Sequence, residues 1–503
     1  MTLGFHKRSN GGLISFSLFI FSLQENPLSL RRNFGEGDNY RKQKMGRIVQ
    51  LKSEHPPSKS LRCVLENDFF DSFLKDLNFP FPQLPRAMKH YLIFGITFLL
   101  VSASVAQEAV IDYRKLSDAE RLQAAKEIAQ ATIMVDGHVD LPYRMKVGGF
   151  TLQREVLDVS VRTPDGNFDY PRAKEGGLDA PFMSIYIPAG NQAIPGASKA
   201  LADSLILMTE RLAATFPNKF AMAYSPEDIE ANFSKGLISL PMGMENGAGI
   251  ENDLGNVGYF YQRGIRYITL THGKDNLIGD ASYDTTATHG GLSEFGKKVV
   301  AEMNRVGIMV DLSHVSDNTF RDALAISKVP VIASHSSVRK FTPGFERNMS
   351  DELIQALAKN GGVMLINFGG TFIDSAYASG SAQVREHVVN WLAENSLSRS
   401  DPKAQKYIQE YTAQHNPFPT VARVADHFDH VVQLVGINHV GLGSDFDGVG
   451  DSLPTGLKDV SMFPNLLAEL LKRGYSKEDL EKICHKNIFR MWRAVAEFAE
   501  NQN

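Results

Sequence analysis

The chain has 503 residues, of which 43% are hydrophobic and 22% are charged, as in an ordinary globular protein. Its formal net charge of −4 provides no basic field for nucleic acid, so we expect no nucleic-acid partner. Its only two cysteines, Cys63 and Cys484, exclude a disulfide framework and a cysteine-rich zinc site, so His, Asp and Glu must bind any metal.

Residues 88–106 have the layout of a secretory signal peptide. A basic start at Lys89 is followed by an apolar run at 91–101 and by the small residues Ser104 and Ala106. The apolar run is shorter than the roughly 20 residues that cross a bilayer, so we expect no membrane anchor in the mature chain. We therefore predict export to the periplasm or the extracellular space.

The position of this segment divides the chain into three parts. A signal peptide begins a nascent chain, whereas this one follows residues 1–87, which lack sustained helical or strand periodicity. We interpret residues 1–87 as an upstream extension of the gene model. Residues 107–503 are then predicted to form a single domain.

From about residue 107, short apolar runs rich in β-formers alternate with amphipathic stretches, which is typical of a parallel α/β sheet. Helices are predicted between the runs, for example at 292–307, 316–328 and 350–361, the last with Ser350 as its N-cap and Gly361 as its stop. The eight apolar runs are predicted strands at 132–140, 180–188, 237–247, 266–272, 307–314, 330–336, 362–368 and 438–448.

The number of strands and the placement of polar residues both predict a (β/α)8 barrel. In such a barrel all eight strands open onto one face, where the active site lies. The polar residues at the carboxyl ends of the predicted strands are His138, Asp140, Glu245, His272, His314, His335 and Asp445.

Three of these residues come from two strands. Strand alternation places His138 and Asp140 on the same side of the chain, where both can reach one ion. Glu245 has two oxygens and can bridge two cations. Its flanking glycines, Gly243 and Gly247, are expected to let the backbone turn sharply.

His314 and His335 end two consecutive predicted strands and complete a set of five donors. Nitrogen and carboxylate ligands without thiolates suit zinc, and five ligands suit two ions that share Glu245. Two such ions about 3.5 Å apart would hold a bridging hydroxide and polarise a carbonyl group. The sequence therefore predicts a hydrolytic centre.

Eight motifs occur in the order seen in the renal dipeptidase family, which the chain resembles from about residue 110 to 500. The resemblance implies a zinc-dependent dipeptidase, with dipeptides as substrates and homodimers among its relatives. The motifs are VDGHVDLP, GMENGAG, RYITLTH, VDLSH, ASHSSVR, ERN, GGVMLINF and GLGSDFDG.

The resemblance also implies a role for each site residue. One zinc would be bound by His138, Asp140 and Glu245, and the other by Glu245, His314 and His335. His272 would contact the reacting carbonyl oxygen, Arg347 the substrate carboxylate and Asp445 the proton in transit, with Asp447 as the alternative for this last role. The chain departs from the family pattern at Pro181, Met183 and Gly369, which leaves side-chain preference open.

Two other functions compete with this interpretation. One is a different binuclear amidohydrolase, acting on a cyclic amide, a lactone or an N-acyl amino acid. Many such barrels begin with His-x-His and bridge their metals with a modified lysine, whereas this chain has His138-x-Asp140 and Glu245. The other is a metal-free binding barrel, against which the complete ligand set argues.

Overall fold

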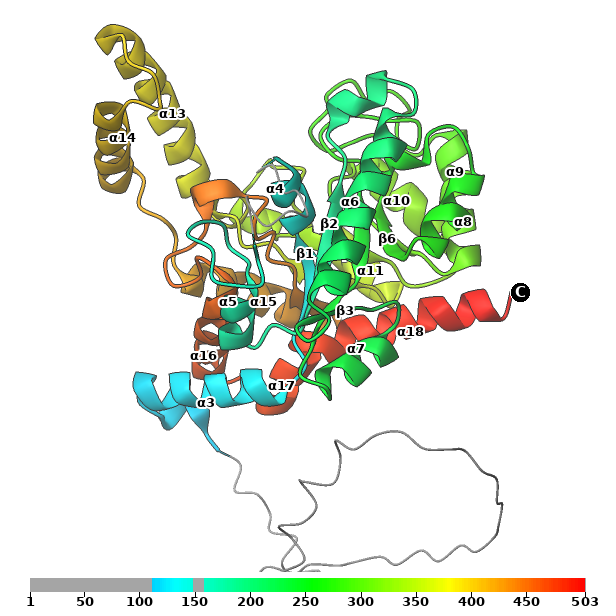
Figure 1. Cartoon of the computed structure of the whole chain (residues 1–503), viewed down its shortest axis with the longest axis horizontal. Helices are drawn as coiled ribbons and strands as arrows, with labels where there is room; N and C mark the ends of the chain where they lie inside the picture. Colours follow the sequence, from blue (N-terminus) through cyan, green and yellow to red (C-terminus); the bar gives the residue numbers. More distant parts are fainter. Residues whose placement is uncertain (1–110, 148–157, 503) are drawn as a thin grey trace, which may run out of the picture. The chain divides into compact units, whose positions relative to one another are not determined.

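The computed structural model describes residues 111–147 and 158–502, which form a closed barrel of parallel strands surrounded by helices (Figure 1). The predicted (β/α)8 fold is therefore confirmed. The predicted extension at 1–87 and the predicted signal peptide at 88–106 lie outside the described residues. The strands around the barrel are, in order, β1 (Val135–Val139), β10 (Val440–Leu442), β9 (Val363–Ile366), β8 (Ile332–Ser336), β7 (Met309–Asp311), β6 (Ile265–Thr269), β5 (Met242–Glu245) and β2 (Ala180–Tyr186).

The barrel strands are buried on both faces, which explains their continuous apolar sequences. Every residue of the eight strands is buried except Tyr186, at the carboxyl end of β2. The first residues of several strands pack against the C-terminal helix, where the ring of Trp492 lies 5.3 Å from that of Phe182. This helix closes the amino-terminal end of the barrel and leaves the other end for function.

The prediction of one strand at 237–247 is wrong. This run forms two strands, β4 (Ile238–Leu240) and β5, and only β5 joins the barrel. β4 pairs instead with β3 (Phe220–Met222) in a separate two-stranded sheet. Pro241 stands between the two strands and has no N–H group to continue the ladder, although its carbonyl accepts a hydrogen bond from Met183 N at 2.8 Å.

The predicted helices have the expected ends. Ser350 accepts a hydrogen bond from Leu353 N, and Gly361 has a φ of 87°, which glycine adopts without strain. The helices are α3 (Asp118–Ala131), α4 (Leu141–Val147), α5 (Tyr170–Gly176), α6 (Ala197–Thr215), α7 (Pro226–Phe233), α8 (Gly255–Gln262), α9 (Glu294–Val306), α10 (Asp317–Ile326), α11 (Asp351–Lys359), α12 (Gly370–Ile373), α13 (Ser375–Asn395), α14 (Pro402–His415), α15 (Val421–Val435), α16 (Phe463–Arg473), α17 (Lys477–Glu481) and α18 (Asn487–Glu500). Within the described ranges, none of these helices combines the length and apolar character needed to span a bilayer.

Helices α13 and α14 form a hairpin that stands away from the barrel (Figure 1). The hairpin has a small hydrophobic cluster of its own, separate from the barrel core. Its two helices also share an aromatic contact, because the rings of Trp391 and Tyr407 stack at 3.9 Å. The buried members of the cluster are Val384, Val388, Leu392 and Ala404.

Candidate metal centre

The side chains predicted to bind metal converge at the carboxyl end of the barrel. Parallel strands deliver their final residues to a common rim, so positions far apart in sequence become neighbours. His138 and His335 lie within β1 and β8, and Glu245 is the last residue of β5. Asp140 follows β1 directly, and His314 lies three residues beyond the end of β7.

One oxygen of Glu245 faces two histidines. Its Oε1 atom lies 3.0 Å from His314 Nε2 and 3.2 Å from His335 Nε2, and these two nitrogens are 2.9 Å apart. Ligand atoms around one tetrahedral zinc ion are separated by about 3.3 Å, given metal bonds of about 2.0 Å. The three atoms therefore have the spacing of ligands to a single cation.

The other oxygen of Glu245 faces the β1 motif. Its Oε2 atom lies 3.5 Å from His138 Nε2, which in turn lies 3.5 Å from Asp140 Oδ2. His138 Nε2 and Asp140 Oδ1 are buried and have no hydrogen-bond partner among the described residues, as expected for atoms directed at a cation. The described donors form three overlapping groups, two of which include Glu245, so the donor set suits metal binding around this carboxylate.

The tautomer of His138 is fixed by a tyrosine. The hydroxyl of Tyr267 donates to the carbonyl of Gly137 at 3.0 Å and lies 2.8 Å from His138 Nδ1. Because the single hydroxyl proton is used on Gly137, Nδ1 must be the protonated nitrogen and donate to the tyrosine oxygen. Nε2, which has no hydrogen-bond partner among the described residues, is then the ring nitrogen left to contact a metal.

A second chain of hydrogen bonds fixes His335 in the same way. The Ser334 hydroxyl donates to Asp311 Oδ2 at 2.7 Å and lies 2.7 Å from His335 Nδ1. Asp311 is fully buried and also accepts hydrogen bonds from Thr269 Oγ1 and from the backbone N–H of Ser334. His335 Nδ1 therefore donates to Ser334, and its Nε2 atom faces Glu245 unprotonated.

Burial sets the charge of the ligands. It lowers the pKa of His314 and of His335 well below the usual range, so both are neutral near pH 7, as metal binding requires. Burial opposes ionisation of Glu245, but the nearby His138 and His272 hold its pKa well below the usual range. Burial opposes protonation of His138, but Tyr267, Glu245 and Asp140 raise its pKa well above the usual range. The centre thus presents the neutral imidazoles of His314 and His335 beside an ionised carboxylate.

Asp445 lies beside this centre, and its carboxyl group has a raised pKa. Burial, with Asp140 and Glu245 nearby, raises its pKa well above the usual range. Asn367 Nδ2 donates to Asp445 Oδ2 at 2.7 Å. A Cβ atom at Gly448 would lie 2.2 Å from Asp445 Oδ1, so only glycine leaves room for this oxygen.

His314, Asp445 and Asp447 have a left-handed backbone, which non-glycine residues rarely adopt. Their φ angles are 67° at His314, 63° at Asp445 and 65° at Asp447. Such conformations cost about 1–3 kcal/mol each and concentrate at functional sites. They turn the chain sharply just beyond β7 and β10.

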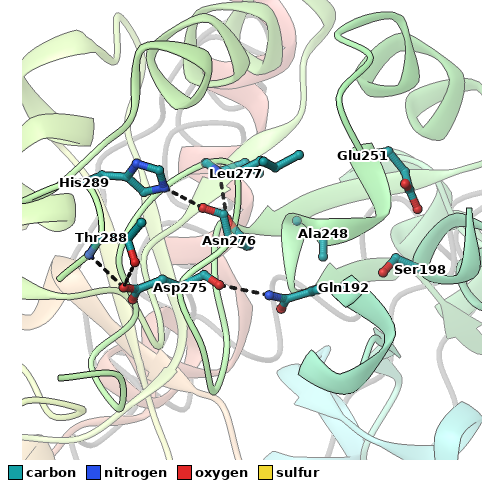
Figure 2. A pocket seen from close by; sticks show the side chains of 11 residues that line it. Gln192, Ser198, Ala248, Glu251, Asp275, Asn276, Leu277, Thr288 and His289 are labelled. Carbon is teal, nitrogen blue, oxygen red and sulfur yellow. Dashed lines mark hydrogen bonds between the residues drawn. The ribbon is translucent and has the colours of Figure 1, made fainter. Parts of the chain in front are cut away.

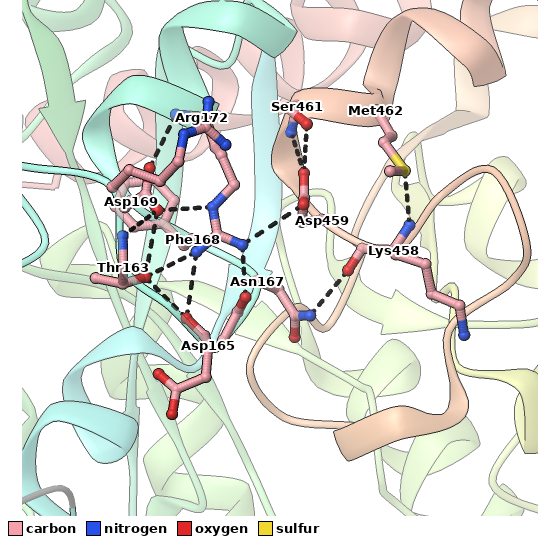
Figure 3. Close-up of polar contacts among 12 residues, drawn as sticks. Thr163, Asp165, Asn167, Phe168, Asp169, Arg172, Lys458, Asp459, Ser461 and Met462 are labelled. Atoms are coloured by element: carbon pink, nitrogen blue, oxygen red, sulfur yellow. Dashed lines mark hydrogen bonds and ion pairs between the residues drawn. The ribbon is translucent and has the colours of Figure 1, made fainter. Parts of the chain in front are cut away.

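Asp447, the alternative to Asp445, is occupied by other partners. Its carboxylate pairs with Arg144 Nη1 at 2.9 Å and accepts a hydrogen bond from Asn167 N. Asn167 accepts a hydrogen bond from Asp447 N and donates from its side chain to the carbonyl of Lys458, the latter drawn in Figure 3. Asp447 therefore joins the loop after β10 to the segment before α5, whereas Asp445 faces the metal ligands.

Arg347 and His272 lie at the edge of the metal centre. Arg347 is 3% exposed, and its guanidinium donates to the carbonyl of His335 at 2.8 Å and to Ser336 Oγ at 3.0 Å. His272 Nε2 lies 3.6 Å from Glu245 Oε1, and its ring is 4.8 Å from the ring of Tyr186. The structure thus brings both predicted substrate contacts beside the predicted ligands.

The role predicted for the glycines that flank Glu245 is wrong. Neither has a positive φ, and the turn is made by Asn246, with a φ of 81°. A Cβ atom at Gly243 would lie 2.0 Å from Tyr267 Cζ, so this glycine makes room for the ring that reaches His138. Gly247 instead lies close to Ile278. Gly243, a glycine inside a strand, was the sequence signal that could have indicated a large side chain, here Tyr267, packed against β5.

A separate cavity of about 330 Å³ lies among the segments that follow β2, β5 and β6 (Figure 2). Its lining includes Asn276, whose side chain donates to Asn246 Oδ1 at 3.0 Å, and Gln192, which accepts from Asn246 Nδ2. The hydrogen bonds of Asn276 and Gln192 thus hold Asn246, the residue next to Glu245. No predicted metal ligand lines the cavity, so it is distinct from the metal centre.

Comparisons with known proteins place the chain among dipeptidases. The sequence model of the membrane dipeptidase family, peptidase family M19, matches residues 122–503. Dipeptidase verJ of Clonostachys rogersoniana is 35% identical over 387 residues, covering 75% of this chain and 88% of the relative. Dipeptidase tcpJ of Claviceps purpurea (strain 20.1) is 34% identical over 343 residues, covering 67% of this chain and 71% of the relative.

A solved structure shares the fold. The probable dipeptidase PvdM from Pseudomonas aeruginosa has a TM-score of 0.64 and 25% sequence identity, over 76% of this chain and 100% of that chain. The residues matched by the family include the whole of the metal centre described above.

Proposed function

Because this chain belongs to the membrane dipeptidase family, peptidase family M19, we propose that it cleaves dipeptides with two zinc ions held around Glu245. The chain is a metal-dependent dipeptidase, a hydrolase of peptide bonds in small substrates. The observation that carries the zinc proposal is the division of donors between the two oxygens of one buried carboxylate.

The ligand distances support one division of the residues between the ions. His314 and His335 both approach Glu245 Oε1, so we propose that they bind the same ion. His138 approaches Oε2 and Asp140, so we propose that these two bind the other ion. When bound, the two ions would supply a hydroxide nucleophile at neutral pH and polarise the scissile carbonyl group.

The remaining residues bind the substrate and move protons. Arg347 pairs with the free carboxylate of the dipeptide through its planar guanidinium. His272 donates a hydrogen bond to the oxyanion that develops on the scissile carbonyl. Asp445 accepts the proton released by the nucleophile and transfers it to the leaving amine, a task suited to a carboxylate with a raised pKa.

Metal analysis combined with a peptide panel tests this function. We expect two zinc ions per chain, loss of dipeptide cleavage in the presence of a chelator and recovery when zinc is added. Tripeptides should be cleaved much more slowly, because their carboxylate lies one residue beyond Arg347. Fewer than one zinc per chain, or equal rates on tripeptides and dipeptides, would contradict the proposal.

The variant Asp445→Asn isolates the proton-transfer step. Its amide has the shape of the carboxylate but cannot accept a proton, so we expect kcat to fall about 10²–10⁴-fold with both metals retained. The control is Asp451→Asn, because the Asp451 side chain is 91% exposed and should not affect turnover. A normal kcat in the Asp445→Asn enzyme would show that Asp445 does not transfer the proton.

A further inference from the structure

Three aromatic side chains form a row between Arg347 and the metal centre. The ring of Phe372 lies 5.4 Å from the guanidinium of Arg347 and 5.9 Å from the ring of Phe345. Phe345 lies 5.9 Å from Tyr283, whose ring lies 6.0 Å from that of His314. The row therefore begins at the proposed carboxylate contact and ends at a proposed metal ligand.

Each ring comes from a different loop at the carboxyl face of the barrel. Tyr283 belongs to the connection between β6 and α9, Phe345 to the connection between β8 and α11, and Phe372 to α12, which follows β9. Because the three rings come from segments far apart in the sequence, no helical or strand periodicity explains why they lie side by side. Its members share only their place around the site.

The rings keep apolar surface available beside a polar centre. Tyr283 is 42% exposed, and Phe345 and Phe372 are partly exposed. Large apolar groups that remain accessible around charged residues are typical of binding sites. The row thus offers a surface on which an apolar side chain can pack.

The ring next to Arg347 is held firmly. A Cβ atom at Gly369 would lie 2.7 Å from Phe372 Cδ2, so glycine at this position lets the ring sit against the backbone. The carbonyl of Phe372 accepts a hydrogen bond from Asn348 Nδ2 at 2.6 Å. The anchored backbone and the close packing against Gly369 reduce the conformational freedom that the ring has to lose when it contacts a ligand.

We propose that Tyr283, Phe345 and Phe372 bind the side chain of the C-terminal residue of the dipeptide and favour aromatic and large aliphatic residues there. The inference rests on the proposed function. The C-terminal residue carries both the carboxylate that pairs with Arg347 and the nitrogen of the scissile bond at the metal centre. Its side chain must therefore lie near the row that connects these two points.

Four dipeptides test the proposal with the zinc-loaded full chain. Ala-Phe and Ala-Leu should exceed Ala-Gly and Ala-Asp in kcat/KM by at least about 10-fold, because an apolar contact is lost in the latter pair. Tyr283→Ala and Phe345→Ala should reduce this ratio severalfold, because kcat/KM should fall more for Ala-Phe and Ala-Leu than for Ala-Gly. Tyr261→Ala, a change at a 37% exposed tyrosine on α8, is the matched control and should leave the ratio unchanged.

The outcomes separate this inference from the proposed function. If none of the four dipeptides is cleaved in the presence of zinc, the proposed function fails. If all four are cleaved at similar kcat/KM, the function stands and the role of the aromatic row is wrong. The row is also excluded as a specificity site if Tyr283→Ala and Phe345→Ala lower kcat/KM equally for all four substrates.

Discussion

At the scale of single residues, two hydroxyl groups orient His138 and His335. Tyr267 accepts from His138 Nδ1, and Ser334 accepts from His335 Nδ1. Removing such a partner usually costs about 10–100-fold in metal affinity. We therefore expect Tyr267→Phe to weaken the ion bound by His138, and Ser334→Ala the ion bound by His335, each by about this factor.

Competition with a chromophoric chelator measures both affinities. Because the proposed ions have different ligands, each variant should change one zinc dissociation constant more than the other. Phenylalanine preserves the packing of the ring against Phe182, so a loss of affinity in Tyr267→Phe would not follow from a cavity. Unchanged zinc binding in both variants would show that the hydroxyls do not orient the ligands.

His427 is a buried histidine outside the metal centre, and it predicts a pH dependence of stability. Burial lowers its pKa to about 4, its Nδ1 accepts from Val338 N and its Nε2 donates to the Ile373 carbonyl. Below about pH 6.5, His427 is protonated in the unfolded chain, whereas in the folded chain it stays neutral until about pH 4. Stability therefore falls as the pH decreases, by about 2 kcal/mol at pH 5.

Chemical denaturation at pH 7 and pH 5 checks this prediction. The free energy of unfolding of His427→Gln should fall less between the two values than that of the unchanged protein, since glutamine does not titrate. Metal ligands titrate in both proteins, so their effect cancels in the comparison. Equal losses in the two proteins would contradict the assignment.

The sequence predicted which side chains meet at the carboxyl end of the barrel, but not the residues that orient them. His138, Glu245 and His335 carry distinctive chemistry at predicted strand ends, so barrel geometry was enough to bring them together. The contact of Tyr267 with His138 depends on the pairing of Tyr267 with Gly243 in neighbouring strands, which no local pattern reveals. Serine and tyrosine are also too common in strands to indicate such a role.

At the scale of elements, the ion pair between Arg144 and Asp447 joins α4 to the loop after β10. The Asp447 side chain is 1% exposed and the Arg144 side chain 15% exposed, and loss of one partner from such a pair typically costs about 3–5 kcal/mol. Because Asp447 is two residues from Asp445, we expect Arg144→Gln and Asp447→Asn to lower kcat as well as stability.

A double-mutant cycle measures this link. The Arg144→Gln/Asp447→Asn protein should be destabilised by less than the sum of the single changes, with a coupling of about 0.5–3 kcal/mol. Zinc content should stay normal in all three variants, because neither residue is a proposed ligand. Additive effects on unfolding, with kcat unchanged, would show that the pair does not support the loop.

Element prediction succeeded where the apolar runs were uninterrupted. The prediction merged β4 with β5 because the runs on either side of Pro241 are both apolar. Only the structure shows that β4 pairs with β3, whereas β5 pairs with β2 and β6. The prediction missed β3, since three residues are too few to show a periodicity. The hairpin of α13 and α14 was also not predicted, because its hydrophobic cluster is separate from the barrel core and does not alter the apolar runs of the barrel strands.

At the scale of the whole molecule, the barrel residues account for both the fold and the site. The predicted single domain begins at residue 107, and the family match begins at residue 122. We expect a chain of residues 107–503 to bind zinc and cleave dipeptides with the kcat of the full chain. Thermal unfolding should have the same midpoint in both proteins, and a truncated chain that does not fold would contradict the domain boundary.

The separate cluster of the α13–α14 hairpin has a consequence for local stability. Its buried side chains contact one another, so the hairpin can open without exposing the barrel core. Amide protons in Ser375–His415 should therefore exchange with deuterated solvent sooner than those of the barrel strands. The hairpin would then unfold as an independent cooperative unit, and substitutions within it would leave the residues at the carboxyl end of the barrel in place.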